Sequence, residues 1–222
     1  MEAHEAGRIV ENVLSEKHPD WTIDTVALAD GGEGFCEILT GAQSGKLERH
    51  TVPGSLRQPI EARLGWVTGQ DLSDQTRSDW KLTESSKIAI IEMAQASGLQ
   101  ELPINERDCW KTTSLGTGEL IRIAVYQGAD TILLGVGGSS TNDLGLGVLE
   151  ALGLRFYNQD GQLLQPIRPE LWDQVDHIKG SLPHKLPPFK IACDVQNPLF
   201  GPQGAAAIYG PQRPQARGLR SY

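Results

Sequence analysis

The sequence has few cysteines and a deficit of positive charge. Three of the 222 residues are cysteines, and no two of them form a Cys-x-x-Cys pair. This spacing excludes a disulfide framework or a cysteine zinc site and favours reduced thiols in the cytoplasm. Lysine and arginine number 20 against 28 aspartates and glutamates, for a net charge of −8. A nucleic-acid partner is therefore not expected, because binding a phosphate backbone needs a basic surface.

Long apolar runs are missing as well. No stretch approaches the roughly 18 residues that cross a bilayer, and residues 1–6 are acidic, unlike a signal peptide. We therefore expect no membrane partner and a cytoplasmic location. Hydrophobic residues still make up 39% of the chain and charged residues 22%, a globular balance that excludes an intrinsically disordered chain.

Glycine is plentiful, with 25 residues, and many of them follow apolar segments. The first unit is a predicted helix over 2–17, a strand over 21–28 and a glycine loop that leads into a helix from Phe35. Strand, loop and helix in this order are the unit of a parallel α/β sheet. The pattern returns from residue 87, with predicted strands over 87–91, 131–136 and 189–193, helices over 93–99, 118–128 and 143–152, and a hairpin over 154–164.

Residues 45–70 have a different pattern. Their short alternating stretches are broken by Pro53-Gly54 and Gln58-Pro59, which predicts antiparallel strands. The polar residues 68–86 that follow are predicted to form a surface loop.

The most specific motif is Gly-Val-Gly-Gly-Ser-Ser-Thr-Asn-Asp at 135–143. It brings backbone N–H groups, hydroxyls and a carboxylate to the N-terminus of a helix, where the helix dipole favours an anion. Asp143 either holds magnesium or caps the helix, and the whole segment has a second interpretation as a tight capped turn. The candidate ligand-binding residues here are Gly137, Gly138, Ser139, Ser140, Thr141 and Asn142.

Three further segments place polar groups at strand or helix ends. Asp30-Gly31-Gly32-Glu33-Gly34 follows a predicted strand and is either a ligand loop or a solvated turn. Gly116 and Thr117 stand at a helix N-terminus, as a phosphate cradle or a cap. Asp194 follows a strand, with Asn197 close by, and is a general base, a metal ligand or part of an Asx turn.

Taken together, these motifs resemble the glycerate kinase type 1 family in order and spacing, from the first residues to about Gln212. That family phosphorylates D-glycerate with ATP and magnesium, usually at the 2-hydroxyl. The resemblance implies a glycerate kinase with two α/β domains and an active site in the cleft between them. The motifs that carry it are Ala-Asp-Gly-Gly-Glu-Gly at 29–34, Thr-Ser-Leu-Gly-Thr-Gly-Glu-Leu at 113–120, the 135–143 motif, Asp-Val-Gln-Asn-Pro-Leu at 194–199 and Tyr-Gly-Pro-Gln at 209–212.

Phosphoryl transfer needs positioning and charge neutralisation, which suggests roles for these residues. Under the resemblance, Asp194 or Asp30 accepts the substrate proton, and the 137–141 loop holds phosphate. Asp143 and Glu33 are the expected magnesium ligands, while the assignment of each carboxylate as base or ligand stays open. We predict that 1–45 and 87–155 share a Rossmann-like parallel sheet, and that 46–86 and 156–212 belong to a second, mixed α/β domain.

The sequence departs from the family at both ends. The strand and Asp-Ser-Phe-Lys loop with which the family begins are absent, and residues 213–222 diverge from its pattern. We therefore expect a chain truncated at both ends, with both domains incomplete and little glycerate turnover by itself. The alternatives are a non-catalytic remnant that binds nucleotide or small anions, and another α/β enzyme acting on a phosphorylated or carboxylated small molecule.

Overall fold

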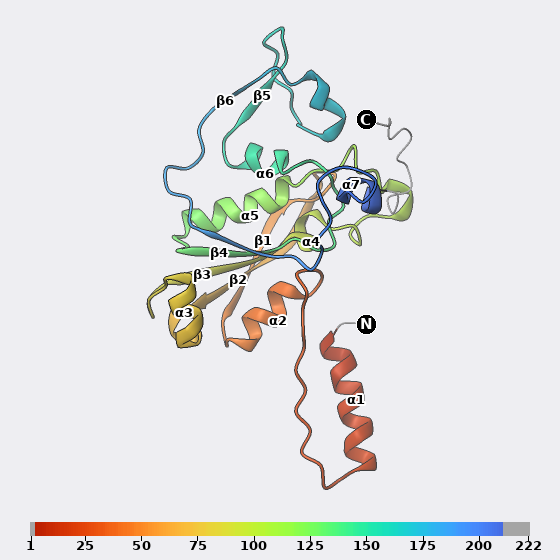
Figure 1. Ribbon diagram of the computed structural model, residues 1–222, viewed down its shortest axis with the longest axis vertical. Helices are drawn as coiled ribbons and strands as arrows, with labels where there is room; N and C mark the ends of the chain where they lie inside the picture. The colour runs from red at the N-terminus through yellow and green to blue at the C-terminus, as the bar shows by residue number, and fades with distance from the viewer. Residues whose placement is uncertain (1–2, 211–222) are drawn as a thin grey trace.

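The computed structural model describes residues 3–210, which form an α/β body with an arm at its N-terminal end (Figure 1). One mixed sheet has the strand order β1-β2-β3-β4-β7. β1, β2 and β3 are antiparallel neighbours, whereas β3, β4 and β7 run parallel. The strands of this sheet are β1 (Lys46–Pro53), β2 (Pro59–Thr68), β3 (Lys87–Glu92), β4 (Thr131–Gly135) and β7 (Phe189–Ala192).

Helices cover both faces of this sheet, α5 on one and α2 on the other (Figure 1). A separate two-stranded sheet pairs β5 (Arg155–Tyr157) with β6 (His177–Lys179). No helix within residues 3–210 has both the length and the apolar character needed to cross a membrane. The α-helices are α1 (Ala3–Lys17), α2 (Phe35–Ala42), α3 (Asp74–Trp80), α4 (Met93–Ser97), α5 (Leu115–Tyr126), α6 (Leu146–Ala151) and α7 (Ala205–Tyr209), and 3-10 turns span Gly69–Asp71, Ile104–Glu106 and Pro169–Gln174.

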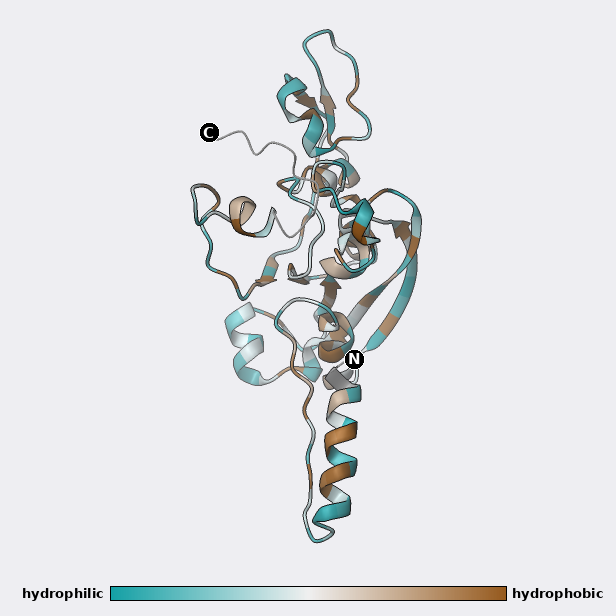
Figure 2. Cartoon of the chain, turned by 90° about the vertical axis from the view of Figure 1, so that its right-hand side faces the viewer, coloured by the Kyte–Doolittle hydropathy of each residue, from teal (hydrophilic) through white to brown (hydrophobic). Residues whose placement is uncertain are grey.

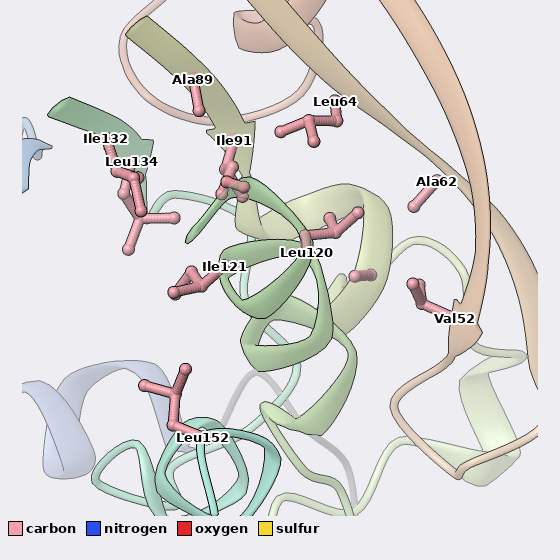
Figure 3. Close-up of a cluster of buried hydrophobic side chains, with 12 residues drawn as sticks. Val52, Ala62, Leu64, Ala89, Ile91, Leu120, Ile121, Ile132, Leu134 and Leu152 are labelled. Atoms are coloured by element: carbon pink, nitrogen blue, oxygen red, sulfur yellow. The ribbon is translucent and has the colours of Figure 1, made fainter. Parts of the chain in front are cut away.

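Strand β3 is buried on both faces because its side chains alternate between two apolar clusters. Ala89 and Ile91 join the larger cluster, to which α5 contributes Leu120 and Ile121 (Figure 3). Ile88 and Ile90 join the smaller cluster on the opposite face, where α2 contributes Phe35 and Cys36. This two-sided burial is typical of a parallel strand covered by helices, and it fixes the position of the strand's carboxyl end.

The expected α/β class is confirmed, with parallel strands at 87–92, 131–135 and 189–192 and antiparallel strands within 45–70. The sheet joins β1 and β2 to β3, so strands from both predicted units pair in one sheet. The boundaries of the two-unit division stay a prediction. The divergent segment 213–222 lies outside the described residues.

Three local predictions differ from the structure. Residues 21–28 form no strand within the described residues, although their apolar side chains alternate. The polar segment 68–86 contains helix α3, whose N-terminus is capped because the Ser73 hydroxyl accepts the Thr76 N–H at 3.1 Å. The hairpin predicted over 154–164 differs only in part. Its turn forms, with the Asn158 N–H donating to the Gln162 carbonyl at 3.0 Å and the Leu164 N–H to the Phe156 carbonyl at 2.8 Å, but the pairing is an isolated bridge between Tyr157 and Leu163, and β5 also pairs with the distant β6.

Candidate active site

Three parallel strands end side by side at one edge of the main sheet. Glu92 of β3 is in register with Gly135 of β4, and Gly135 is in register with Ala192 of β7. The loops after these strands therefore leave the sheet at the same level. Open α/β sheets bind ligands beyond the carboxyl ends of parallel strands, so this edge is the natural place for a site.

Loop 30–34 packs directly on the loop that follows β4. The Gly137 N–H donates to the Gly31 carbonyl at 2.9 Å, and the Val136 N–H donates to the Ala192 carbonyl at 3.2 Å. Gly31 has a φ of +104°, and a Cβ at this position would lie 2.6 Å from the Ala192 carbonyl oxygen. Glycine at position 31 thus lets three chain segments meet at the sheet edge.

We expect Gly31→Ala to lower the free energy of unfolding by about 2–4 kcal/mol, because it combines a left-handed backbone with a backbone clash. Gly201→Ala is the matched control, since Gly201 has a φ of +92° and no neighbouring atom within 4 Å of the added Cβ. That control is expected to lose only about 1–2 kcal/mol. Urea denaturation measures both, and equal losses would show that the contact with Ala192 is unimportant.

A pocket of about 350 Å³ opens at this edge, between the loops after β4 and β7 and helix α7. Six of the residues predicted to bind ligand or act in catalysis line it, namely Gly137, Gly138, Ser139, Thr141, Asn142 and Asp194. The other lining residues are Leu99, Val136, Cys193, Val195, Ala205 and Tyr209, which were not predicted as site residues. The structure therefore brings two of the predicted motifs, 135–143 and 194–199, to one cavity.

Among the described residues that line this pocket, Asp194 is the one that carries a carboxylate side chain. Its side chain is exposed, and it lies two residues beyond the end of β7. An accessible carboxylate can accept a proton from a hydroxyl group or coordinate a metal ion. The described lining includes no lysine or arginine, so a bound anion would meet backbone N–H groups and hydroxyls here.

The two carboxylates of loop 30–34 lie outside the pocket lining. Asp30 Oδ1 accepts the Gly32 N–H at 3.0 Å, which closes a tight turn of the Asx type. Glu33 is exposed and borders the pocket, because its Oε1 lies 2.7 Å from the place a Cβ of Gly138 would take. Gly31 and Gly32 are buried, so these two glycines pack the loop and their predicted ligand contact is not supported.

The Asp143 carboxylate is buried and surrounded by protein donors. Its Oδ2 accepts the Ser114 N–H and hydroxyl, both at 2.8 Å, and the Gly147 N–H at 3.1 Å, while Oδ1 accepts the Gly145 N–H at 3.1 Å. Only 2% of the residue is exposed. These contacts join the beginnings of α5 and α6 and match the capping alternative. Magnesium binding at Asp143 remains a prediction that they do not support.

Two hydroxyls of the 135–143 motif also anchor the loop. The Ser140 hydroxyl donates to the Ser97 carbonyl at 2.9 Å and lies 2.7 Å from the Ser55 hydroxyl. The Thr141 hydroxyl donates to the Thr112 carbonyl at 3.0 Å. Both residues are buried, so their hydroxyls hold the loop in shape, whereas Gly137, Gly138 and Ser139 form its accessible part.

Gly116 and Thr117 lie inside the body, away from the pocket lining. A Cβ on Gly116 would meet the Pro53 carbonyl oxygen at 1.9 Å. The Thr117 hydroxyl lies 2.9 Å from the Ser97 hydroxyl, and both residues are buried. Close packing of α5 against β1 and α4 uses these two positions, so the phosphate cradle stays a prediction that their surroundings do not support.

Asn197 holds Tyr209, a residue that lines the pocket. Its Oδ1 accepts the Tyr209 hydroxyl at 2.9 Å, and its Nδ2 donates to the Gln203 carbonyl at 2.9 Å. Tyr209 lines the pocket, whereas Asn197 is not among the lining residues. The structure shows Asn197 in contact with helix α7, and its direct contact with ligand stays a prediction.

Sequence analysis missed Glu92, whose carboxylate holds the start of α2. It accepts the Gly34 N–H at 3.2 Å, the Cys36 N–H at 3.0 Å and the Gln95 side-chain amide at 3.1 Å. Glu92 is 2% exposed and fixes loop 30–34 at the end of β3. The sequence signal that could have identified Glu92 is its position directly after the apolar run 88–91, at the carboxyl end of a predicted strand.

Burial, and to a smaller extent the nearby Glu92 carboxylate, raises the pKa of the Cys36 thiol to about 12. As the pH rises above 9, the unfolded thiol ionises while the folded thiol keeps its proton. The free energy of unfolding is therefore expected to fall by about 1.4 kcal/mol per pH unit until about pH 12. Urea denaturation between pH 8 and 11 checks this, with Cys36→Ala expected to lack this part of the slope. Parallel profiles would contradict the assignment.

No group of three or more His, Cys, Asp or Glu side chains within residues 3–210 is arranged to hold a metal ion. Magnesium in phosphoryl-transfer sites is commonly held by one or two carboxylates together with substrate phosphates. Asp194 in the pocket and Glu33 at its rim are the carboxylates that fit such a site, in which substrate phosphates supply the other ligands.

Comparisons with known proteins agree on one family. The model of the Glycerate kinase family matches residues 1–217. The chain is 38% identical to glycerate 2-kinase of Escherichia coli K12 and 37% identical to glycerate kinase of Bacillus cereus, each over 96% of this chain and 52% of the relative. A crystal structure from Salmonella typhimurium LT2, assigned as glycerate kinase 2, matches with a TM-score of 0.73 and 37% identity over 97% of this chain and 54% of that one.

The chain thus spans about half the length of these relatives. The match nevertheless includes every residue that lines the pocket, from Leu99 to Tyr209, and loop 30–34 beside it. With a family model over 217 residues, close relatives and a solved structure in agreement, the chain belongs to the glycerate kinase family.

Proposed function

We propose that this chain binds D-glycerate in the pocket beyond β4 and β7 and takes part in its ATP-dependent phosphorylation, with 2-phosphoglycerate as the favoured product. The observation that carries the proposal is that Asp194 and the glycine loop at 137–139 line one cavity of about 350 Å³. This volume is at the lower end of the range for small-molecule sites, which suits a three-carbon acid. Family membership supports the reaction class.

In this proposal Asp194 accepts the proton of the attacking hydroxyl, and the N–H of the exposed Gly138 binds a phosphate oxygen. The Gly137 N–H is held by the Gly31 carbonyl, so Gly137 shapes the loop. Backbone donors from a glycine loop suit phosphate because they approach it closely. Magnesium supplies charge neutralisation of the phosphates when bound, and Asp194 or Glu33 would hold it. Asp30 is less suited as the base, because its carboxylate closes its own turn outside the pocket.

We also propose a cytoplasmic location. Cys36 and Cys193 are free thiols, which are typical of reducing compartments.

Calorimetry and a coupled assay test the proposal together. D-glycerate and magnesium ATP are titrated into the purified chain, and ADP formation is followed with both present. Saturable D-glycerate binding, together with ADP formation that depends on D-glycerate, is the expected result. Binding of nucleotide or anions without any turnover would favour a non-catalytic module, and absence of D-glycerate binding would refute the proposed function.

A further inference from the structure

Residues 3–29, here called the arm, project from the body instead of packing on it. The arm consists of helix α1 and an extended segment that runs back to loop 30–34 (Figure 1). Its large apolar side chains are unusually exposed: 59% for Trp21, 74% for Val26 and 83% for Leu28. Figure 2 shows apolar residues along α1 as well.

The arm has the internal geometry of a helix packed on one face of a strand. A Cβ on Gly7 would lie 3.8 Å from the Thr25 side chain, and the Thr25 hydroxyl donates to the Glu11 carboxylate at 3.3 Å. Because successive side chains of an extended chain point to opposite faces, Val26 and Leu28 point away from α1. That far face has no cover.

No strand within residues 3–210 pairs with the arm. The hydrogen bonds of the described residues include none to the backbone of residues 22–29. On α1, Ile9, Val10 and Val13 are 49%, 54% and 46% exposed, so the apolar stripe of the helix is wider than the single segment it covers. Unpaired backbone on both sides, with an apolar far face, is what an interior strand of a parallel sheet shows before the sheet is complete.

We propose that the arm docks into an α/β sheet formed by the half of a glycerate kinase that this chain does not match. The Salmonella structure matches 97% of this chain but only 54% of its own chain, so the counterpart of the arm there belongs to a chain nearly twice as long. The arm is also acidic, with Arg8 and Lys17 against Glu5, Glu11, Glu16, Asp20 and Asp24. This charge disfavours an anionic membrane or nucleic acid as the occupant.

Docking would also complete the surroundings of the pocket. The arm continues without a break into loop 30–34, which packs on Gly137 of the pocket wall. A sheet built on residues 21–28 therefore lies next to the site. The inference uses the family of the chain and does not depend on turnover of D-glycerate.

The test combines the purified chain with the half of Escherichia coli glycerate 2-kinase that it does not match. Size-exclusion chromatography with light scattering is expected to show a 1:1 complex, and amide exchange over residues 22–28 is expected to slow at least tenfold. Val26→Asp with Leu28→Asp should weaken the complex at least tenfold. Ile104→Asp, at a residue 69% exposed outside the arm, is the matched control and should leave binding unchanged.

Three results would overturn the proposal: no complex, a complex that the paired arm substitutions leave intact, or a homodimer of this chain that protects residues 22–28. If the partner half is insoluble alone, the two halves are joined in one polypeptide, where unprotected amides at 22–28 refute docking. Unchanged thermal midpoints of the variants confirm that they fold. A complex without turnover would uphold docking and count against the proposed function instead.

Discussion

Asp194→Asn is expected to reduce D-glycerate phosphorylation at least 100-fold, because general-base catalysis contributes about 10²–10⁴ in rate. Asparagine keeps the size of the side chain but cannot accept the hydroxyl proton. Asp194 is exposed at the pocket wall, so the thermal midpoint should stay unchanged. The initial rate of ADP formation is measured under the condition in which the unsubstituted chain turns over, alone or with the partner half.

Asp30→Asn is the matched control for this substitution. Asp30 lies outside the pocket lining and its carboxylate accepts the Gly32 N–H, so a rate change of less than about fivefold is expected, because the substitution leaves the pocket groups in place. D-glycerate affinity should also change little in Asp194→Asn, since a base acts mainly on the transition state. If Asp30→Asn has the larger effect, the roles given to the two carboxylates are reversed.

Asp143→Ala is expected to lower the free energy of unfolding by about 3–5 kcal/mol, because it leaves several buried donors unpaired. The lost acceptor serves Ser114, Gly145 and Gly147. For a chain of this size the loss corresponds to a decrease in Tm of roughly 10 °C. Differential scanning calorimetry measures it, with the exposed Asp173→Ala as the control that should shift the Tm by less than about 2 °C.

This substitution also separates the two interpretations of Asp143. A capping residue affects stability whether or not magnesium is present. A metal ligand would instead leave the Tm of the magnesium-free protein nearly unchanged and raise the magnesium concentration needed for activity. The second outcome would contradict the role inferred from its four hydrogen bonds.

The local pattern of apolar residues and glycines predicted the strands and loops that form the pocket. The apolar runs at 87–91 and 131–136 are long enough to be buried on both faces, and the glycines after them break regular structure, so strand followed by loop was readable in the sequence. The motifs at 137–139 and 194 then lie together because parallel strands in register end at one edge. Sequence alone did not reveal that β1 and β2 join the same sheet, since strand pairing depends on residues far apart in the chain.

The family, the α/β class and the polar motifs at the strand ends were readable from the amino-acid sequence, because residue type and spacing are local properties. Only the tertiary structure decided which carboxylate is accessible: Asp194 faces a cavity, whereas Asp143 is enclosed by the beginnings of two helices. The folded structure also shows that residues 21–28, whose apolar side chains alternate as in a strand, pair with no strand of the described part of the chain. Burial and pairing depend on what the rest of the chain places nearby, and a motif does not encode its neighbours.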